Sequence, residues 1–324
     1  MRILVRATNW LGDAIMCLPA LHALRSSYPQ AHIAILGLPW MRDLYGRESF
    51  CDEVIDYPVE RGAKNLAAKY ALAKSLRGRF DKALLLQSAF EAAAFAFAAR
   101  IPNRTGYNRD GRSFLLTHPV SVPIIGHERF YYLELLRLAG WIPGYDIDAP
   151  IRLHGVTRVK SRRIGVSPGA AFGSAKRWYP ERFAEAAATV AIERDMSVAL
   201  FGSASERDIV SVVEAALKAR GVAVENFAGR TTLAEFIQLV ASCELMLTND
   251  SGAMHVAYAV GTPSLTIFGS TDHIGTGPVG INARIVREAV DCAPCKLREC
   301  PIDHRCMTRI SAERVAREAL DLLK

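Results

Sequence analysis

The sequence predicts an α/β protein built from two doubly wound parallel sheets in tandem. Short apolar runs alternate with stretches of helical periodicity along most of the chain, which is typical of parallel strands joined by crossover helices. The 324 residues, half of them hydrophobic, exceed what one core usually holds. The alternation breaks around residues 146–163 and then restarts. These observations place a domain boundary near Val156, between residues 1–155 and 156–324.

The first half contains four short apolar runs that we interpret as strands. They cover residues 3–5, 32–36, 53–56 and 82–86. Helices are expected over residues 11–24, 63–76, 89–98 and 128–138. Pro19 removes a backbone donor within the first of these helices, so we expect a kink or a later helix start there.

The second half repeats the pattern. Its predicted strands cover residues 163–167, 197–201, 244–247 and 264–268. Its predicted helices cover residues 180–194, 205–220, 233–242 and 251–260, and a final amphipathic helix covers residues 312–323. Sheets of this kind bind ligands at the carboxyl ends of their strands, so two of them facing each other would form a central cleft.

Composition excludes several classes of protein. The apolar content is too high for a disordered chain, and seven cysteines in this length do not indicate a disulfide scaffold. The longest apolar run, Ala92–Ala99, is bounded by Glu91 and Arg100. It is much shorter than the roughly 18 residues that are needed to span a bilayer. Arg6 and Asp13 interrupt any signal-peptide core near the amino terminus, so we expect a cytosolic location.

The charge balance favours an anionic partner. Forty basic residues stand against 33 acidic ones, which gives a formal net charge of +7. An anionic substrate and an anionic membrane surface both fit this excess. Nucleic acid is not expected, because the basic residues are scattered and no nucleic-acid-binding motif is present.

The first candidate segment for a functional site is Thr8–Asp13, where the first strand leads into the first helix. Gly12 permits close approach of the backbone to a ligand. Asp13 then either faces that ligand or caps the helix. The three spaced glycines of a dinucleotide-binding loop are absent, which argues against a nicotinamide or flavin enzyme.

A second candidate segment follows the first strand of the second half. Gly169 lies in its opening turn, and Lys176 comes shortly before Pro180, which is expected to open a helix. Lys176 would supply a compact positive charge to a phosphate. The alternative is that Lys176 and Arg177 are solvated bases beside a tryptophan, Trp178, that packs in the core.

The most informative segment is Leu247–His255, where an apolar strand ends in a polar turn and a helix begins. Ser251 and Gly252 in the first turn would present unpaired N–H groups to a phosphate. His255 either donates to the same anion or is buried with a partner of its own. Asp250 would repel phosphate, so we expect it to cap the helix or to accept a hydrogen bond from a hydroxyl or a lysine.

Four cysteines near the carboxyl terminus form a further candidate site. Cys292, Cys295, Cys300 and Cys306 are separated by two, four and five residues, a compact spacing for four thiolates around one zinc or iron ion. The later gaps are not those of a standard finger or ribbon, so reduced thiols without metal fit equally well. The remaining cysteines lie in apolar stretches and are expected in the core: Cys17, Cys51 and Cys243.

Three of these segments together carry a resemblance. They are Asn9–Asp13, Pro168–Ala170 with Lys176–Trp178, and Thr248–His255. Over essentially its whole length the chain resembles glycosyltransferase family nine, the heptosyltransferases of lipopolysaccharide inner-core assembly. The Asn-Trp-Leu-Gly-Asp and Asn-Asp-Ser-Gly segments, with the terminal His304–Met307, are most similar to the heptosyltransferase II branch.

The resemblance implies a fold of the GT-B type, with two Rossmann-like domains facing a central cleft. It implies an ADP-heptose donor, a lipid A-core oligosaccharide acceptor, inversion at the anomeric carbon and no catalytic metal or cofactor. Asp13 is then the general base, while Gly12, Gly169, Lys176 and the turn Asp250–His255 line the nucleotide-sugar pocket. A metal held by the four cysteines would be structural, since such a transfer leaves it no chemical task.

A lipid-linked, phosphorylated acceptor would also give the basic residues of the first half a use. The candidates to meet its phosphates, or the anionic inner leaflet at the cytosolic face of the inner membrane, are Arg61, Lys64, Lys69 and Lys74. The alternative for them is a solvated helix face. Two other functions stay open: a family enzyme with another sugar or acceptor, and a nucleotide-binding scaffold that has lost transfer.

Overall fold

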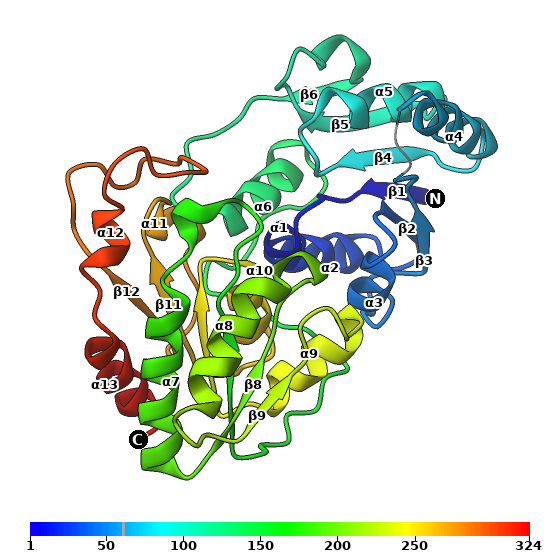
Figure 1. The fold of residues 1–324 in the computed structure, drawn as a ribbon. Helices are drawn as coiled ribbons and strands as arrows, with labels where there is room; N and C mark the ends of the chain where they lie inside the picture. Colours follow the sequence, from blue (N-terminus) through cyan, green and yellow to red (C-terminus); the bar gives the residue numbers. More distant parts are fainter. Residues whose placement is uncertain (60–61) are drawn as a thin grey trace. The chain divides into compact units, whose positions relative to one another are not determined.

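The computed structural model describes residues 1–59 and 62–324, which form two compact units, Met1–Ala149 and Pro150–Lys324 (Figure 1). The division falls a few residues before the expected position at Val156. Leu153 explains the difference, because its backbone N–H donates to the carbonyl of Ala259 at 3.0 Å and its side chain is buried. The residues just before Val156 therefore belong to the second unit.

The first unit contains a six-stranded parallel sheet with the order β3-β2-β1-β4-β5-β6. The strands are β1 (Arg2–Arg6), β2 (His32–Gly37), β3 (Glu53–Asp56), β4 (Lys82–Leu85), β5 (Asn103–Tyr107) and β6 (His118–Val120). The four apolar strands were expected, and β5 and β6 were not. Both missed strands lie at one edge of the sheet and carry polar residues, so neither has a continuous apolar run.

In the described part of this unit, six α-helices connect and cover these strands. They are α1 (Leu11–Met16), α2 (Leu18–Ser27), α3 (Met41–Tyr45), α4 (Gly62–Ser75), α5 (Phe90–Ala98) and α6 (Glu128–Leu138). The single helix expected over residues 11–24 is divided at Cys17, and Pro19 lies in the first turn of α2. The later helix start is confirmed, because a proline is tolerated where its missing N–H has no helical partner.

The second unit repeats the architecture, with the strand order β12-β11-β10-β7-β8-β9. The strands are β7 (Arg163–Ser167), β8 (Ser197–Leu200), β9 (Val224–Asn226), β10 (Leu245–Asn249), β11 (Ser264–Phe268) and β12 (Ala283–Arg287). The helices are α7 (Pro180–Arg194), α8 (Arg207–Lys218), α9 (Leu233–Ser242), α10 (Gly252–Ala259), α11 (His273–Thr276), α12 (Arg305–Thr308) and α13 (Ala312–Leu322). The edge strands β9 and β12 were not expected. No helix among the described residues is long and apolar enough to cross a membrane.

The strand orders locate where each sheet can bind a ligand. In the first sheet the chain runs outward from β1 through β2 to β3 and then returns to β4 beside β1. In the second sheet it runs outward from β7 through β8 to β9 and returns to β10 beside β7. Crossover helices then lie on opposite faces, so a crevice opens at the carboxyl ends of the two central strands. The predicted site segments follow β1, β7 and β10, at these two switch points.

Candidate active site

The first switch point holds Asp13. Trp10 is the N-cap residue of α1 and makes no side-chain cap, while Asp13 lies in the first turn. Asp13 therefore does not occupy the N-cap position, which was one of the two alternatives for it. This position places the carboxyl group near the end of β1. In the first turn of a helix, the helix dipole stabilises a negative charge.

Two groups near Asp13, the Cys17 thiol and the Tyr132 hydroxyl, are neutral at ordinary pH. Burial, and next the charge of Asp13, raise the pKa of the Cys17 thiol well above its usual value. Burial likewise raises the pKa of the Tyr132 hydroxyl, with the charges of Cys17 and Asp13 adding to the effect. Cys17 is fully buried, as expected for a core residue. Both groups therefore stay protonated at ordinary pH beside the Asp13 carboxyl group.

Arg6, the last residue of β1, organises the loop that leads to Asp13. Its side chain is almost completely buried. Nη1 donates to the carbonyl of Ala7 at 2.6 Å, and Nη2 donates to Oδ1 of Asn9 at 3.2 Å. The guanidinium lies 4.1 Å from the centre of the Tyr57 ring. Arg6 was not among the residues predicted for the site, although a charged side chain directly after the apolar run Ile3–Val5 was a signal for it.

One of the four predicted basic residues contacts the same region. Lys69 Nζ lies 2.7 Å from a carboxylate oxygen of Glu91, in the first turn of α5. Burial opposes the charged carboxylate, but hydrogen bonds from Lys69 and from the Tyr57 hydroxyl hold the pKa of Glu91 below its usual value. Lys64 and Lys74 are exposed on α4, and Arg61 lies outside the described residues.

The second switch point holds an ion pair. Lys176 Nζ lies 2.6 Å from Oδ2 of Asp250, and the two side chains are 15% and 4% exposed. The hydroxyl of Thr271 donates to the same carboxylate oxygen. Asp250 thus accepts hydrogen bonds from a lysine and a hydroxyl, as expected, and the N-cap position of α10 belongs to Ser251.

A buried amide joins the two loops that carry this pair. Asn249, the last residue of β10, accepts a hydrogen bond from the backbone N–H of Trp178 at 3.0 Å. Its Nδ2 donates to the carbonyl of Pro168 at 2.7 Å. Trp178 is fully buried, and its Nε1 donates to the carbonyl of Ile310 at 3.2 Å. Trp178 packs in the core, as the alternative interpretation of this segment had it, although Lys176 beside it is not a solvated base. The loops after β7 and β10 are held together by these hydrogen bonds.

Gly169 lies against a carboxylate that sequence analysis did not single out. A Cβ at Gly169 would lie 2.2 Å from Oε1 of Glu206, so a larger residue would displace that side chain. Oε2 of Glu206 accepts from both the backbone N–H and the hydroxyl of Ser203, each at 2.8 Å. The Ser-x-x-Glu pattern signals only a helix start. Beyond that signal, the position of Glu206 against Gly169 places a carboxylate hydrogen-bond acceptor beside the loop that is predicted to bind phosphate.

The first turn of α10 has the form expected of an anion site. Ser251 is the N-cap residue in extended conformation and makes no side-chain cap, while its hydroxyl lies 3.2 Å from that of Thr248. The helix itself begins at Gly252. His255 is buried, and its Nδ1 lies 2.8 Å from the Tyr258 hydroxyl. The second alternative for His255, burial with a partner of its own, describes this contact.

The four carboxy-terminal cysteines are free thiols. Cys292 and Cys295 are exposed, Cys300 is half-buried and Cys306 is buried. Burial, followed by the charges of the other three thiols, raises the pKa of Cys306 to about 11. Across residues 1–59 and 62–324, no three of these sulfurs lie within 4.8 Å of one another. Four ligands of one zinc ion lie about 3.8 Å apart, so the thiols would have to move closer together to bind a single ion.

The cysteine-containing loop has a second role, because it contacts the backbone that carries Lys176. The backbone N–H of Ala175 donates to the carbonyl of Arg298 at 2.9 Å, and Nε2 of His304 lies 3.1 Å from the carbonyl of Ala175. A Cβ at Gly173 would lie 2.2 Å from the Arg298 carbonyl oxygen. The loop therefore supports the position of Lys176 from outside the sheet.

The remaining expected core cysteines differ in burial. Cys243 is buried, as expected, and burial raises the pKa of its thiol to about 12. Cys51 is only half-buried, and its Sγ donates to the carbonyl of Glu53 at 3.4 Å. Cys51 lies just before the edge strand β3, which is less completely covered than the central strands.

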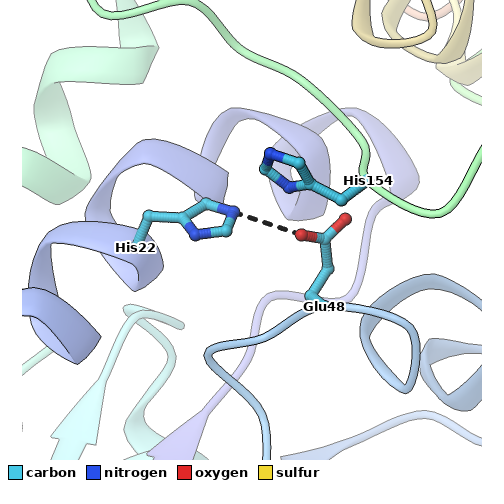
Figure 2. A group of neighbouring side chains, drawn as sticks. All are labelled: His22, Glu48 and His154. Atoms are coloured by element: carbon cyan, nitrogen blue, oxygen red, sulfur yellow. Dashed lines mark hydrogen bonds and ion pairs between the residues drawn. The ribbon is translucent and has the colours of Figure 1, made fainter. Parts of the chain in front are cut away.

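A further titratable pair lies elsewhere in the first unit. Figure 2 shows His22 of α2 pointing to Glu48, with Nε2 at 3.1 Å from Oε2. Glu48 is buried, and the His22 ring packs edge-on against Phe50 with the ring centres 4.9 Å apart. A buried carboxylate is costly without a hydrogen-bond partner, so we interpret this pair as structural.

Comparison with known proteins agrees with this geometry. Residues 69–305 match the family model described as glycosyltransferase family 9 (heptosyltransferase). Lipopolysaccharide heptosyltransferase 2 of Escherichia coli is 33% identical over 310 residues, which cover 89% of this chain and 88% of the relative. Lipooligosaccharide heptosyltransferase 2 of Haemophilus ducreyi is 30% identical over 352 residues, which cover 100% and 99%.

Among solved structures, the E. coli ADP-heptose lipopolysaccharide heptosyltransferase II matches with a TM-score of 0.82. The sequence identity is 29%, and the match covers 100% of this chain and 98% of that one. The expected GT-B type of fold is confirmed by this match. Since the family model covers well over half of the chain and the relatives cover nearly all of it, the chain belongs to glycosyltransferase family 9, the heptosyltransferases.

Proposed function

We propose that this protein transfers a heptose from ADP-heptose to the inner core of lipopolysaccharide, with inversion at the anomeric carbon. The observation that carries the proposal is the Lys176–Asp250 pair beside the first turn of α10. The named relatives support the sugar and the acceptor, because they are lipopolysaccharide and lipooligosaccharide heptosyltransferases. A solved relative at 29% identity is named for ADP-heptose.

The second unit supplies the nucleotide-sugar pocket in this proposal. Ser251 and Gly252 direct the free N–H groups of α10 to the diphosphate, where the helix dipole adds positive charge. Lys176 has three ammonium donors, so its contact with Asp250 leaves others for a phosphate oxygen. The Glu206 carboxylate beside Gly169 suits a hydroxyl of the nucleotide, which can donate a hydrogen bond to it.

The first unit binds the acceptor and supplies the base. The acceptor hydroxyl oxygen forms a bond to the anomeric carbon while the bond from that carbon to the diphosphate breaks. The hydroxyl proton passes to Asp13, and ADP departs with the bonding electron pair. Lys176 and the N-terminus of α10 stabilise the charge that develops on the leaving diphosphate, and this interaction strengthens in the transition state.

The proposal includes no catalytic cofactor, since Lys176 and a helix N-terminus together neutralise the diphosphate. The four cysteines stay candidates for a structural zinc or iron ion and take no part in the transfer. The lipid-linked acceptor places the enzyme at the cytosolic face of the inner membrane, in peripheral contact with the leaflet. Nucleic acid is not a partner in this account.

The test is a donor screen with the purified protein and a truncated core acceptor. ADP-heptose is compared with ADP-hexoses and with UDP- and GDP-sugars, with and without EDTA. We expect ADP release only with ADP-heptose, an acceptor heavier by one heptose, and unchanged turnover in EDTA. Equal transfer from another donor would assign a different sugar. ADP binding without turnover on any donor would favour a nucleotide-binding scaffold, and strict magnesium dependence would contradict the role given to Lys176.

A further inference from the structure

All of the excess positive charge of the chain lies in one segment. Residues 62–127 contain ten Lys and Arg residues and three Asp and Glu residues. The difference equals the formal net charge of +7 of the whole protein. This segment contains the strands β4, β5 and β6, which form one half of the first sheet, and the helices α4 and α5. The electrostatic attraction for an anionic partner is therefore concentrated on this part of the first unit.

The same segment exposes aromatic side chains. Phe90 and Phe97 are seven residues apart on α5, so they share one face of that helix, and they are 46% and 55% exposed. Phe114, in the short turn after β5, is 74% exposed, and its ring centre lies 6.1 Å from that of Phe90. The outer face of α5 is thus aromatic where a solvated helix face is usually polar.

Basic side chains are interleaved with these rings. The Arg104 guanidinium lies 5.5 Å from the Phe97 ring centre. Arg77, two residues after the end of α4, lies 5.9 Å from the ring centre of the exposed Tyr70, and its Nε donates to the carbonyl of Ala98 at 3.1 Å. This hydrogen bond joins the turn after α4 to the end of α5. We name the exposed residues Tyr70, Phe90, Phe97, Arg100 and Phe114, with their neighbours Arg77 and Arg104, the aromatic-basic face.

We propose that the aromatic-basic face docks on an anionic lipid bilayer. Aromatic rings are favoured at the membrane interface, where they lie among the headgroups with their apolar surface toward the acyl chains. Lys and Arg side chains around them interact with the phosphates of anionic lipids. Charge complementarity selects this partner, because the face contributes three basic residues, Arg77, Arg100 and Arg104, and lies within the segment that carries the positive excess of the protein.

The docked orientation connects the membrane to the active site. β1 and β4 are parallel neighbours, with Ile3 opposite Lys82, so their carboxyl ends lie at the same edge of the sheet. Asp13 follows β1, and Phe90 follows β4. Docking through Phe90 and its neighbours therefore brings this edge to the headgroup level, where a lipid-linked sugar would be found. This step rests on the proposed function, while the docking itself does not.

The experiment measures cosedimentation with vesicles of phosphatidylcholine alone or mixed with phosphatidylglycerol. We expect binding to the mixed vesicles, weaker binding to the neutral ones, and loss of binding in high salt. Arg100→Gln should lower the partition coefficient about fivefold, as expected for one basic residue near an anionic surface. Phe97→Ser with Phe114→Ser should lower it about tenfold or more, because two rings lose their burial at the interface.

Ile192→Ser is the matched control, since Ile192 is 66% exposed on α7 in the second unit. It should bind vesicles like the parent protein. Equal binding by the Phe variants and the control overturns the proposal. A dimer that the Phe variants convert to a monomer, without vesicle binding by the parent, assigns the face to a second copy and also overturns it. If the serine variants unfold, the Arg100→Gln result decides.

Transfer assays separate this proposal from the function. The Phe variants should use a deacylated, water-soluble acceptor at the parent rate and lose transfer to the same core embedded in vesicles. A parent protein that transfers to neither acceptor but binds anionic vesicles through this face contradicts the proposed function and leaves docking supported. Parent-like transfer by the Phe variants to the vesicle-embedded acceptor contradicts docking alone.

Discussion

Lys176 and Asp250 form a nearly buried ion pair, 2.6 Å between Nζ and Oδ2, across the loops that follow β7 and β10. The two strands are hydrogen-bonded neighbours, with Ser167 opposite Thr248. A pair with so little exposure has lost most of its hydration, so removal of one partner leaves an uncompensated charge. The pair therefore holds the two loops in register, and in the proposed function it also places the ammonium group at the diphosphate.

A double-mutant cycle tests this relationship. We expect Lys176→Met and Asp250→Asn each to lower the free energy of unfolding by about 2 kcal/mol, and the double variant to lose less than their sum by about 1 to 3 kcal/mol. Denaturant titration measures these values. The matched control is the pair Lys160–Glu244, where Nζ lies 3.0 Å from the carboxylate but the lysine is largely exposed. Its coupling should stay below about 1 kcal/mol.

The same lysine variant reports on the pocket. Lys176→Met should weaken ADP binding, measured by calorimetry, and should lower kcat as well, because the lost charge also stabilised the leaving diphosphate. Unchanged ADP affinity in a folded Lys176→Met protein would show that the lysine serves only to neutralise Asp250.

Asp13→Asn separates catalysis from structure. The substitution keeps the shape of the side chain and removes the base, so kcat should fall by about 10²- to 10⁴-fold while ADP affinity is unchanged. Loss of a favourable charge near the start of α1 should cost no more than about 1 kcal/mol of stability. Steady-state kinetics and thermal unfolding measure both effects. A large loss of stability with kcat of the folded fraction preserved would make Asp13 a structural residue.

Gly173→Ala tests whether the cysteine-containing loop supports the lysine. The added Cβ would meet the Arg298 carbonyl oxygen at 2.2 Å, so the loop must move away from the backbone that carries Lys176. We expect weaker ADP binding and lower kcat with only a modest fall in Tm. Gly144→Ala is the control, because no atom lies within 4 Å of its added Cβ. Parent-like kinetics in Gly173→Ala would remove the loop from the description of the site.

Thiol alkylation tests the environments of the cysteines. Near pH 8, iodoacetamide should modify the exposed Cys292 and Cys295 first. Cys243 and Cys306 should resist, because burial raises their pKa values to about 12 and about 11 and leaves little thiolate. Mass spectrometry of peptides identifies the modified positions. Fast modification of Cys306 in folded protein would contradict the buried environment described for it.

Metal content tests the remaining hypothesis for these thiols. If zinc or iron binds, Cys295→Ser should lower both metal content and Tm while the rate per folded molecule is preserved, since the contacts to Ala175 use the Arg298 carbonyl and the His304 ring. Elemental analysis of protein purified without chelator measures the metal. Absence of zinc and iron would leave four reduced thiols. Loss of turnover in folded Cys295→Ser would give the loop a direct part in shaping the pocket.

The sequence by itself determined the central elements of both sheets. Strands such as β1, β10 and β11 are almost completely buried, so most of their residues must be apolar, and that requirement is visible in the sequence. The strands β6, β9 and β12 lie at sheet edges and β5 lies next to one, so they have less apolar surface to bury, and their polar residues concealed them in the sequence. The active-site segments were also recognisable, because each combines a strand end, small residues and a helix start within a few positions.

The partners within the site were decided only by the tertiary structure. Lys176 forms an ion pair with Asp250, Asn249 accepts a hydrogen bond from Trp178, and Gly169 leaves room for the Glu206 side chain. The partners in each of these pairs are far apart in the sequence. Nothing local specifies these pairs, because they depend on the register of parallel strands whose ends meet at one edge of the sheet. Burial is the physical reason. Lys176 would be a solvated base on an open loop, but its loop packs against the end of β10, where the lysine is largely buried and pairs with Asp250.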